Sequence, residues 1–139
     1  MNRLDGKTAL ISGASRGIGA ATAALMINAG ANVIIGDILK NKGEETAKKL
    51  GPNAVFTSLN VTDEGDWSNA VKLAVGKFGS LDILVNNAGL FLGRDFADIS
   101  LDEWNRLASV NMTGVWLGTK VATDALAKSG AISNQGSVI

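Results

Sequence analysis

The order of apolar and polar residues along the chain predicts four strands that alternate with helices. Short apolar runs are typical of strands buried on both faces of a parallel sheet, and they occupy residues 8–11, 31–36, 54–59 and 81–85. Apolar residues recur at helical spacing in residues 17–28, 41–50, 63–78 and 101–128. This alternation predicts a parallel sheet with right-handed crossovers.

Residues at the ends and on the faces of the helices support this assignment. Gly30 stands where a glycine ends the first helix, Thr62 is the expected N-cap of the third, and Ser100 with Glu103 forms a capping box for the long helix. The faces that we expect are Ile18, Ala21, Ala24, Leu25 and Asn28 in the first helix, Ala47 and Leu50 in the second, Trp67, Ala70, Val71, Ala74 and Phe78 in the third, and Trp104, Leu107, Ala108, Val115, Ala122 and Leu126 in the long helix.

The first strand runs into a glycine-rich turn, Ser12 to Gly19, which reads S-G-A-S-R-G-I-G. Glycines at 13, 17 and 19 allow positive φ, a ligand close to the backbone, and tight packing of the next helix. Because the first N–H groups of a helix have no partner inside it, this turn favours a bound diphosphate. The spacing is not that of a P-loop. Taken alone, the turn is also compatible with a loop that binds nothing.

Two polar residues each leave two interpretations open. Asp37 ends the second strand, 18 positions after Gly19, an offset at which a carboxylate meets an adenosine ribose; the alternative is a strand-end carboxylate that caps the next turn. Asn111 falls on the inner face of the long helix, where a buried amide needs hydrogen bonds. It either ties a local kink near Gly114 or presents its amide to a pocket, and the spacing favours the kink.

Composition narrows the function classes. The 139 residues suffice for one domain or part of one, and the charges balance at 13 basic and 13 acidic residues, so we expect neither a nucleic-acid partner nor a membrane partner. The chain has no cysteine and no histidine, which excludes thiolate chemistry, and we expect no metal site. Without an 18-residue apolar run or a signal-peptide core, the expected location is the cytoplasm.

Four motifs together make the sequence similar to one family. The motifs are Ser12 to Gly19, Asp37, Asn86 to Gly89, and Asn111-Met112-Thr113-Gly114. In this order the chain resembles the short-chain dehydrogenase/reductase family along its whole length. The resemblance implies an α/β, doubly wound parallel sheet of Rossmann type with strand order 3-2-1-4, the start of a fifth strand at residues 136–139, and hydride transfer between a nicotinamide and an alcohol or ketone.

The resemblance also implies a role for each matching residue. Asn111 would act in catalysis, by bending the long helix and holding a water of the proton relay. Asn60 replaces the aspartate that is usual in the family, and its amide can still accept from and donate to adenine. The positions expected to bind the cofactor are Gly13, Ser15, Arg16, Gly17, Ile18 and Gly19 around the diphosphate, Asp37 at the adenosine ribose, Asn60 and Val61 at adenine, and Asn87, Ala88 and Gly89 at the nicotinamide ribose.

The family's catalytic serine and its Tyr-x-x-x-Lys pair are absent, and the chain contains no tyrosine. Residues 1–139 therefore look like an incomplete, truncated cofactor-binding domain of a longer enzyme, and we expect them to be inactive alone. The alternative is a non-enzymatic dinucleotide-binding or interaction protein.

Charge at the ribose site predicts the cofactor. Asp37 would accept from both ribose hydroxyls and repel a 2′-phosphate, which favours NAD, whereas Arg16 favours NADP; we expect the carboxylate to dominate because exposed ion pairs are weak. The expected partners are a small alcohol or ketone substrate and a second copy of the chain, bound through the long helix 101–128.

Overall fold

The structure, a computed structural model, describes residues 3–129 and contains the predicted parallel sheet. The strand order is β3-β2-β1-β4, which confirms the expected doubly wound α/β fold. The strands are β1 (Thr8–Ser12), β2 (Asn32–Asp37), β3 (Ala54–Ser58) and β4 (Ile83–Val85). The fifth strand, expected at residues 136–139, lies outside the described residues.

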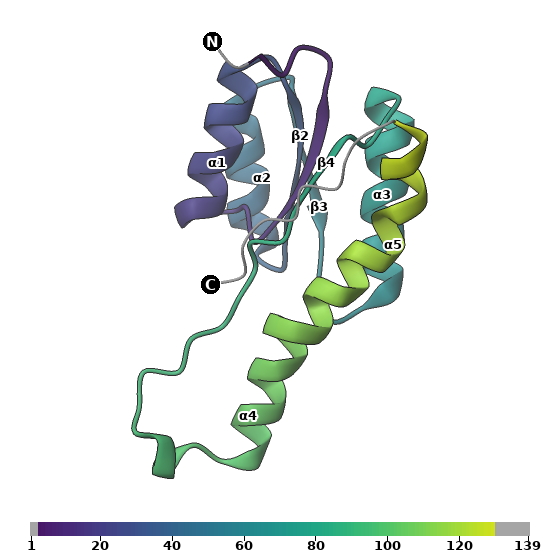
Figure 1. Cartoon of the computed structure of the whole chain (residues 1–139). Coiled ribbons are helices and arrows are strands. Elements are labelled where there is room, and N and C mark those ends of the chain that lie inside the picture. Colours follow the sequence, from purple (N-terminus) through teal and green to yellow (C-terminus); the bar gives the residue numbers. More distant parts are fainter. Residues whose placement is uncertain (1–2, 130–139) are drawn as a thin grey trace.

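Helices cover both faces of the sheet (Figure 1). On one face lie α1 (Gly17–Asn28) and α2 (Lys40–Leu50), and on the other lie α3 (Glu64–Phe78) and α5 (Gly114–Lys128). Alternate strand residues feed two separate cores, so that Ile11 packs on the α1 side and Leu10 on the α3 side. Both faces of β1 are therefore buried, which explains its uninterrupted apolar run.

The register brings the carboxyl ends of all four strands to one edge. Ser12 pairs with Gly36, Ile11 with Val85, and Asp37 with Ser58. In sheets of this kind ligands bind in the crevice outside the carboxyl ends of the strands. The residues that directly follow the strands are therefore the ones to search for a site.

Helix α1 packs through a different face from the one expected. Its buried residues are Gly19 and Ala23, whereas Ile18 is 72% exposed and Leu25 is 70% exposed. Small residues form the packed face because α1 lies very close to the loop before it. A Cβ on Gly19 would overlap the carbonyl oxygen of Gly13. Gly30 ends the helix as predicted, with a φ of +99°.

The N-cap of helix α3 lies one residue after the predicted cap, Thr62. Its N-cap is Asp63, whose carboxylate accepts from the backbone N–H of Asp66 at 2.9 Å. The hydroxyl of Thr62 instead donates to the side-chain oxygen of Asn60 at 2.8 Å. The predicted stripe is confirmed, because Trp67, Ala70 and Ala74 are buried while Val71 and Phe78 pack half-buried against the same core.

The long helix is continuous but is not one uniform α-helix. It comprises α4 (Leu101–Ala108), a π-helical turn η2 (Ser109–Thr113) and α5. The Ser100 capping box is confirmed, and the hydrogen bonds from Ser100 hold the pKa of Glu103 below its usual value. A short 3-10 turn, η1 (Phe96–Asp98), precedes it.

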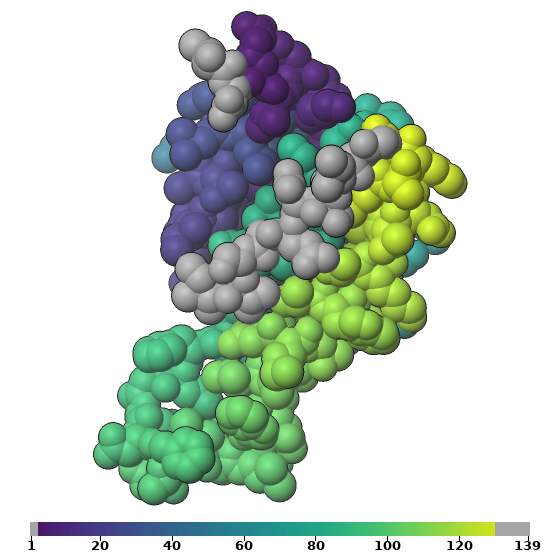
Figure 2. Space-filling view, viewed as in Figure 1, coloured from purple at the N-terminus to yellow at the C-terminus, as the bar shows by residue number. Residues whose placement is uncertain are grey.

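The first part of this helix projects from the body of the molecule (Figures 1 and 2). No residue of η1, α4 or η2 is buried, and the buried positions begin at Gly114 in α5. The expected inner face is therefore confirmed for Ala122 and Leu126 and is wrong for Trp104, which is exposed. The reason is that the sheet lies beside α5 only. Among residues 3–129, no helix is long and apolar enough to cross a membrane.

A buried carboxylate ties β1 to β4 at the opposite edge of the sheet. Asp82 accepts from the backbone N–H of Thr8 at 2.9 Å and from the hydroxyl of Ser80 at 2.7 Å, and Lys7 lies 3.3 Å away. Burial raises the pKa of Asp82, but the hydrogen bonds from Ser80, Thr8 and Lys7 outweigh it and hold this pKa below its usual value.

We predict that Asp82 makes the fold more sensitive to acid. Because its pKa is lower in the folded state, the stabilisation is complete above the unfolded-state pKa of about 3.9 and is lost as the pH falls through the folded-state value. Denaturant unfolding between about pH 6 and pH 3 should show a smaller loss of stability in Asp82→Asn than in the unmodified protein. The exposed Asp102→Asn variant is the control, and an unchanged slope in Asp82→Asn would contradict the prediction.

Candidate functional site

The glycine loop between β1 and α1 has the backbone that the sequence predicts. Gly13 has a φ of +65° and Gly17 a φ of +59°, values that only glycine adopts without strain. A Cβ on Gly17 would meet nothing within 4 Å. Within residues 3–129 the N–H groups of Gly17, Ile18 and Gly19 have no hydrogen-bond partner, and α1 has no acidic residue in its first turn. The loop therefore offers an open site for an anion.

The end of β4 clamps this loop from one side. The backbone N–H groups of Asn87 and Ala88 both donate to the hydroxyl of Ser12 at 3.1 Å. The side-chain amide of Asn87 donates to the carbonyls of Ser12 and Gly13, each at 3.0 Å. A Cβ on Gly13 would lie 2.9 Å from the Cα of Ala88. Asn87 and Ala88 thus border the loop, and their expected place at the nicotinamide ribose stays a prediction. Ser12, which the sequence analysis named as the start of the turn without giving it a role, accepts the bonds that join the loop to the end of β4.

Asp37 clamps the loop from the other side. Its carboxylate is only 8% exposed and accepts from the backbone N–H of Ser15 and of Leu39, each at 3.0 Å. This is the turn-capping arrangement that the sequence left open as an alternative. Each carboxylate oxygen has a second lone pair, so the same side chain can also accept from ribose hydroxyls, and that role stays a prediction.

Ser15 and Arg16 occupy opposite environments within the loop. Ser15 is fully buried, and its hydroxyl has no partner among the described residues. Arg16 is exposed, serves as the N-cap of α1 without a side-chain hydrogen bond, and has no ion-pair partner in the same part of the chain.

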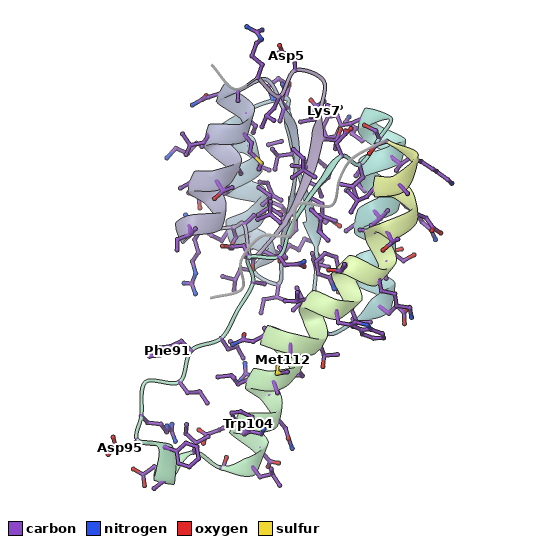
Figure 3. The ribbon with its side chains drawn as sticks, viewed as in Figure 1. Asp5, Lys7, Phe91, Asp95, Trp104 and Met112 are labelled. Atoms are coloured by element: carbon purple, nitrogen blue, oxygen red, sulfur yellow. The ribbon has the colours of Figure 1, made fainter. Side chains whose placement is uncertain are left out.

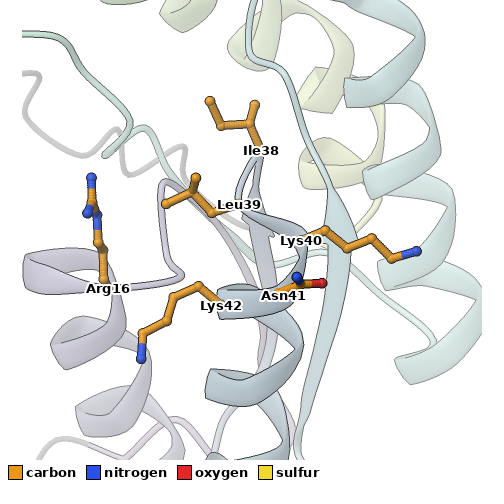
Figure 4. A pocket seen from close by; sticks show the side chains of 6 residues that line it. All are labelled: Arg16, Ile38, Leu39, Lys40, Asn41 and Lys42. Atoms are coloured by element: carbon orange, nitrogen blue, oxygen red, sulfur yellow. The ribbon is translucent and has the colours of Figure 1, made fainter.

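A basic groove of about 570 Å³ lies beside Asp37 (Figure 4). It is lined by Arg16, Ile38, Leu39, Lys40, Asn41 and Lys42. In Figure 4 the side chain of Lys40 points away from those of Arg16 and Lys42. Lys42 pairs with Glu45 at 3.2 Å. The sequence analysis missed these lysines because a Lys/Glu-rich helix start reads as an ordinary solvated surface.

Asn60 and Val61 follow β3 at the same edge of the sheet. The side-chain oxygen of Asn60 accepts from the N–H and the hydroxyl of Thr62, while its amide nitrogen has no partner within residues 3–129. Val61 is buried against Gly114, and its carbonyl accepts from the indole of Trp67 at 2.9 Å. Asn60 is therefore free to contact a ligand, whereas Val61 is mainly a core residue; the adenine contacts of both stay predictions.

Asn111 lies in the π-helical turn, immediately before the part of the helix that is buried. Its amide oxygen accepts from the N–H of Leu90 at 2.7 Å, and its amide nitrogen donates to the carbonyl of Leu90 at 2.8 Å. Widened turns of this kind recur at functional sites. The amide thus holds the segment that follows Gly89. Both of these bonds leave the long helix, which differs from the kink and from the pocket that the sequence left open, and the catalytic role of Asn111 stays a prediction. Leu90 was not foreseen from the sequence.

The loop geometry fits the diphosphate of a dinucleotide. The open Gly17 position and the α1 N–H groups suit a diphosphate, and the buried, unpaired Ser15 hydroxyl lies in the same loop. Among the described residues, no group of three or more acidic side chains could hold a metal ion. Gly89, which directly follows Asn87 and Ala88, is exposed, so the side of the loop next to β4 is accessible.

Comparison with known proteins finds relatives that are named dehydrogenases. Relatives include the trans-4-hydroxycyclohexanecarboxylate dehydrogenase of Sinomonas cyclohexanicum, 42% identical over 147 residues, which cover 99% of this chain and 57% of the relative. The 3-alpha-(or 20-beta)-hydroxysteroid dehydrogenase of Mycobacterium tuberculosis is 42% identical over 137 residues, with 99% of this chain and 51% of the relative covered. The chain therefore spans about half the length of the curated relatives that it matches.

A solved structure shows the same fold. The 3-ketoacyl-(acyl-carrier-protein) reductase from Brucella melitensis, complexed with NADH, is 33% identical and has a TM-score of 0.90, covering 95% of this chain and 57% of that one. The family model for short chain dehydrogenases matches residues 7–139. On this match the chain belongs to the short-chain dehydrogenase/reductase family.

Proposed function

We propose that the chain is the cofactor-binding part of a longer, NAD-dependent dehydrogenase that acts on a secondary alcohol or ketone. The observation that carries the proposal is the glycine loop, where Gly17 faces open space and the first N–H groups of α1 lack partners within the described residues. The NADH complex of the Brucella melitensis reductase, a structural neighbour, supports a nicotinamide cofactor.

Each segment at the carboxyl ends of the strands would hold one part of the cofactor. The loop around Gly17 would bind the diphosphate, Asp37 the adenosine ribose, Asn60 the adenine, and Asn87 to Gly89 the nicotinamide ribose. When bound, the nicotinamide supplies the acceptor or donor of the hydride. Leu90, which Asn111 holds at both backbone atoms, would then form the wall next to the reacting carbon. We keep the role of Asn111 in a proton relay as part of this proposal.

The substrate that we propose is an alicyclic secondary alcohol or its ketone. The names of relatives refer to a hydroxycyclohexane carboxylate, a hydroxysteroid and a cyclohexadiene diol. In this chain the residue after Leu90 is Phe91, whose side chain is 89% exposed. An aromatic side chain in this place suits contact with an apolar ring.

We further propose that the chain associates with a second copy through the projecting part of the long helix. Exposed large apolar side chains lie on this part: Figure 3 shows Trp104 and Met112 on the helix and Phe91 on the loop that precedes it. Trp116 is also exposed, with the ammonium of Lys120 lying 5.3 Å from its ring. Exposed apolar patches of this kind mark association surfaces.

The cofactor preference is tested by dissociation constants. We expect NADH to bind at least about tenfold more tightly than NADPH, a difference of ~1.4 kcal/mol, because Asp37 repels a 2′-phosphate. Asp37→Ala should narrow this gap, and Arg16→Ala should lower the affinity for NADPH more than that for NADH. Equal affinity for the two cofactors in the unmodified protein would refute the assignment.

The fragment interpretation is tested by activity. Residues 1–139 contain neither tyrosine nor histidine, and proton transfer to or from the substrate needs a titratable group in hydrogen-bond reach. We therefore expect NADH binding without cyclohexanol-dependent reduction of NAD. Turnover above that of a Gly17→Trp variant, which should fill the diphosphate site, would show that this chain is catalytically complete.

Association is tested by sedimentation velocity. We expect the unmodified chain to sediment as a dimer or larger species and Trp104→Glu, in the projecting α4, to shift it to monomer, since a carboxylate buried without a partner in the interface is costly. Leu25→Glu, at an exposed apolar residue of α1, is the matched control and should leave the assembly unchanged. A monomeric unmodified chain, an assembly that persists in Trp104→Glu, or dissociation by Leu25→Glu alone would each contradict the proposal.

A further inference from the structure

We propose that Thr46, on α2, is a positioning residue that sets the orientation of the glycine loop for the cofactor. Its hydroxyl donates to the carbonyl of Ser15 at 2.6 Å. Thr46 is 31 positions from Ser15 in sequence and belongs to neither the loop nor the strand ends. The inference rests on the proposed function, because it concerns the site where the dinucleotide would bind.

Close packing of α2 brings Thr46 within reach of the loop. One turn before Thr46, a Cβ on Gly43 would overlap the ring of Phe56 on β3, so the helix lies directly on that side chain. One residue after Thr46, Ala47 is buried in the same core. Thr46 therefore lies on a helix that cannot easily withdraw from the sheet, and its hydroxyl is a rigid donor.

With this hydrogen bond, both the N–H and the carbonyl of Ser15 have a partner. The Ser15 N–H donates to Asp37 at 3.0 Å, while its carbonyl accepts from Thr46. The Ser15 side chain is fully buried, so this residue has little freedom. With its N–H held by β2 and its carbonyl held by α2, the rotation of the chain at Ser15 is fixed.

Fixing the Ser15 carbonyl also fixes the peptide that leads to Arg16. In a planar trans peptide the next N–H points opposite to the carbonyl, so the Arg16 N–H is directed away from α2. Arg16 is extended, with a φ of −156°, and α1 starts at the following residue, Gly17. The bond from Thr46 thereby helps to set the direction in which the first N–H groups of α1 face.

Loss of this hydrogen bond should weaken NADH binding even in a variant that remains fully folded. A carbonyl left without its partner can rotate to reach water, and a loop that samples several orientations must be ordered when a ligand binds, which costs affinity. A role limited to holding α2 on the fold would instead leave the affinity of the folded protein unchanged.

The test compares NADH dissociation constants of the full chain, measured by fluorescence titration at a temperature where circular dichroism shows each variant folded. Thr46→Val removes the donor, and we expect about three- to tenfold weaker NADH binding, whereas Thr46→Ser keeps the donor and should stay within about twofold. ADP-ribose should lose the same factor, because the loop contacts that half of the cofactor. Thr123→Val is the matched control, since the Thr123 hydroxyl donates only to the carbonyl of Thr119 within its own helix.

Different failures have different meanings. If the unmodified chain binds no NADH, the proposed function fails. If it binds NADH and folded Thr46→Val binds it equally well, or if Thr46→Ser weakens binding as much as Thr46→Val, only the positioning role is overturned. Should Thr46→Val not fold, Thr46→Ala takes its place, because alanine removes the hydroxyl and favours the helix.

Discussion

The close approach between the glycine loop and the end of β4 is the constraint on which the rest of the site depends. A Cβ on Gly13 would press on the Cα of Ala88, and the Ser12 hydroxyl accepts two N–H groups from the chain that follows β4. These contacts exist only because β1 and β4 are neighbours in a parallel sheet. The sheet order therefore places the loop, and the loop places the start of α1.

A second set of contacts holds the loop from β2 and α2, so that the backbone is fixed from both sides before any ligand arrives. Asp37 belongs to this set and is also the residue expected to select the cofactor. Its two roles are compatible because its oxygens accept from Ser15 and Leu39 through one lone pair each. The site is thus preorganised by hydrogen bonds from backbone N–H groups to the Asp37 carboxylate and the Ser12 hydroxyl, while the basic side chains of Arg16 and Lys42 lie at its rim.

The long helix separates a structural part from an exposed part. Beyond the π-helical turn, α5 packs closely through two glycines: a Cβ on Gly114 would lie 2.7 Å from the side chain of Val61, and a Cβ on Gly118 would lie 2.5 Å from the ring of Trp67 on α3. Before the turn, α4 has no buried residue and carries apolar side chains outward. Asn111 connects the two parts by holding Leu90, which links the exposed arm to the edge where the cofactor would bind.

The sequence by itself determined the alternation of strands and helices, the glycine loop, the capping box at Ser100 and the core stripe of α3, because each depends on residues close together in the chain. The tertiary structure alone decided that α1 packs through Gly19 and Ala23 and that Trp104 stays exposed. The apolar pattern of a helix does not show whether another element packs against that face. The tertiary structure also decided the partners of Asp37 and Thr46, which come from segments brought together only by the parallel sheet. Hydrogen bonds between distant segments leave no periodic trace in a single sequence, and for this reason the glycine loop was predictable while most of the contacts that orient it were not.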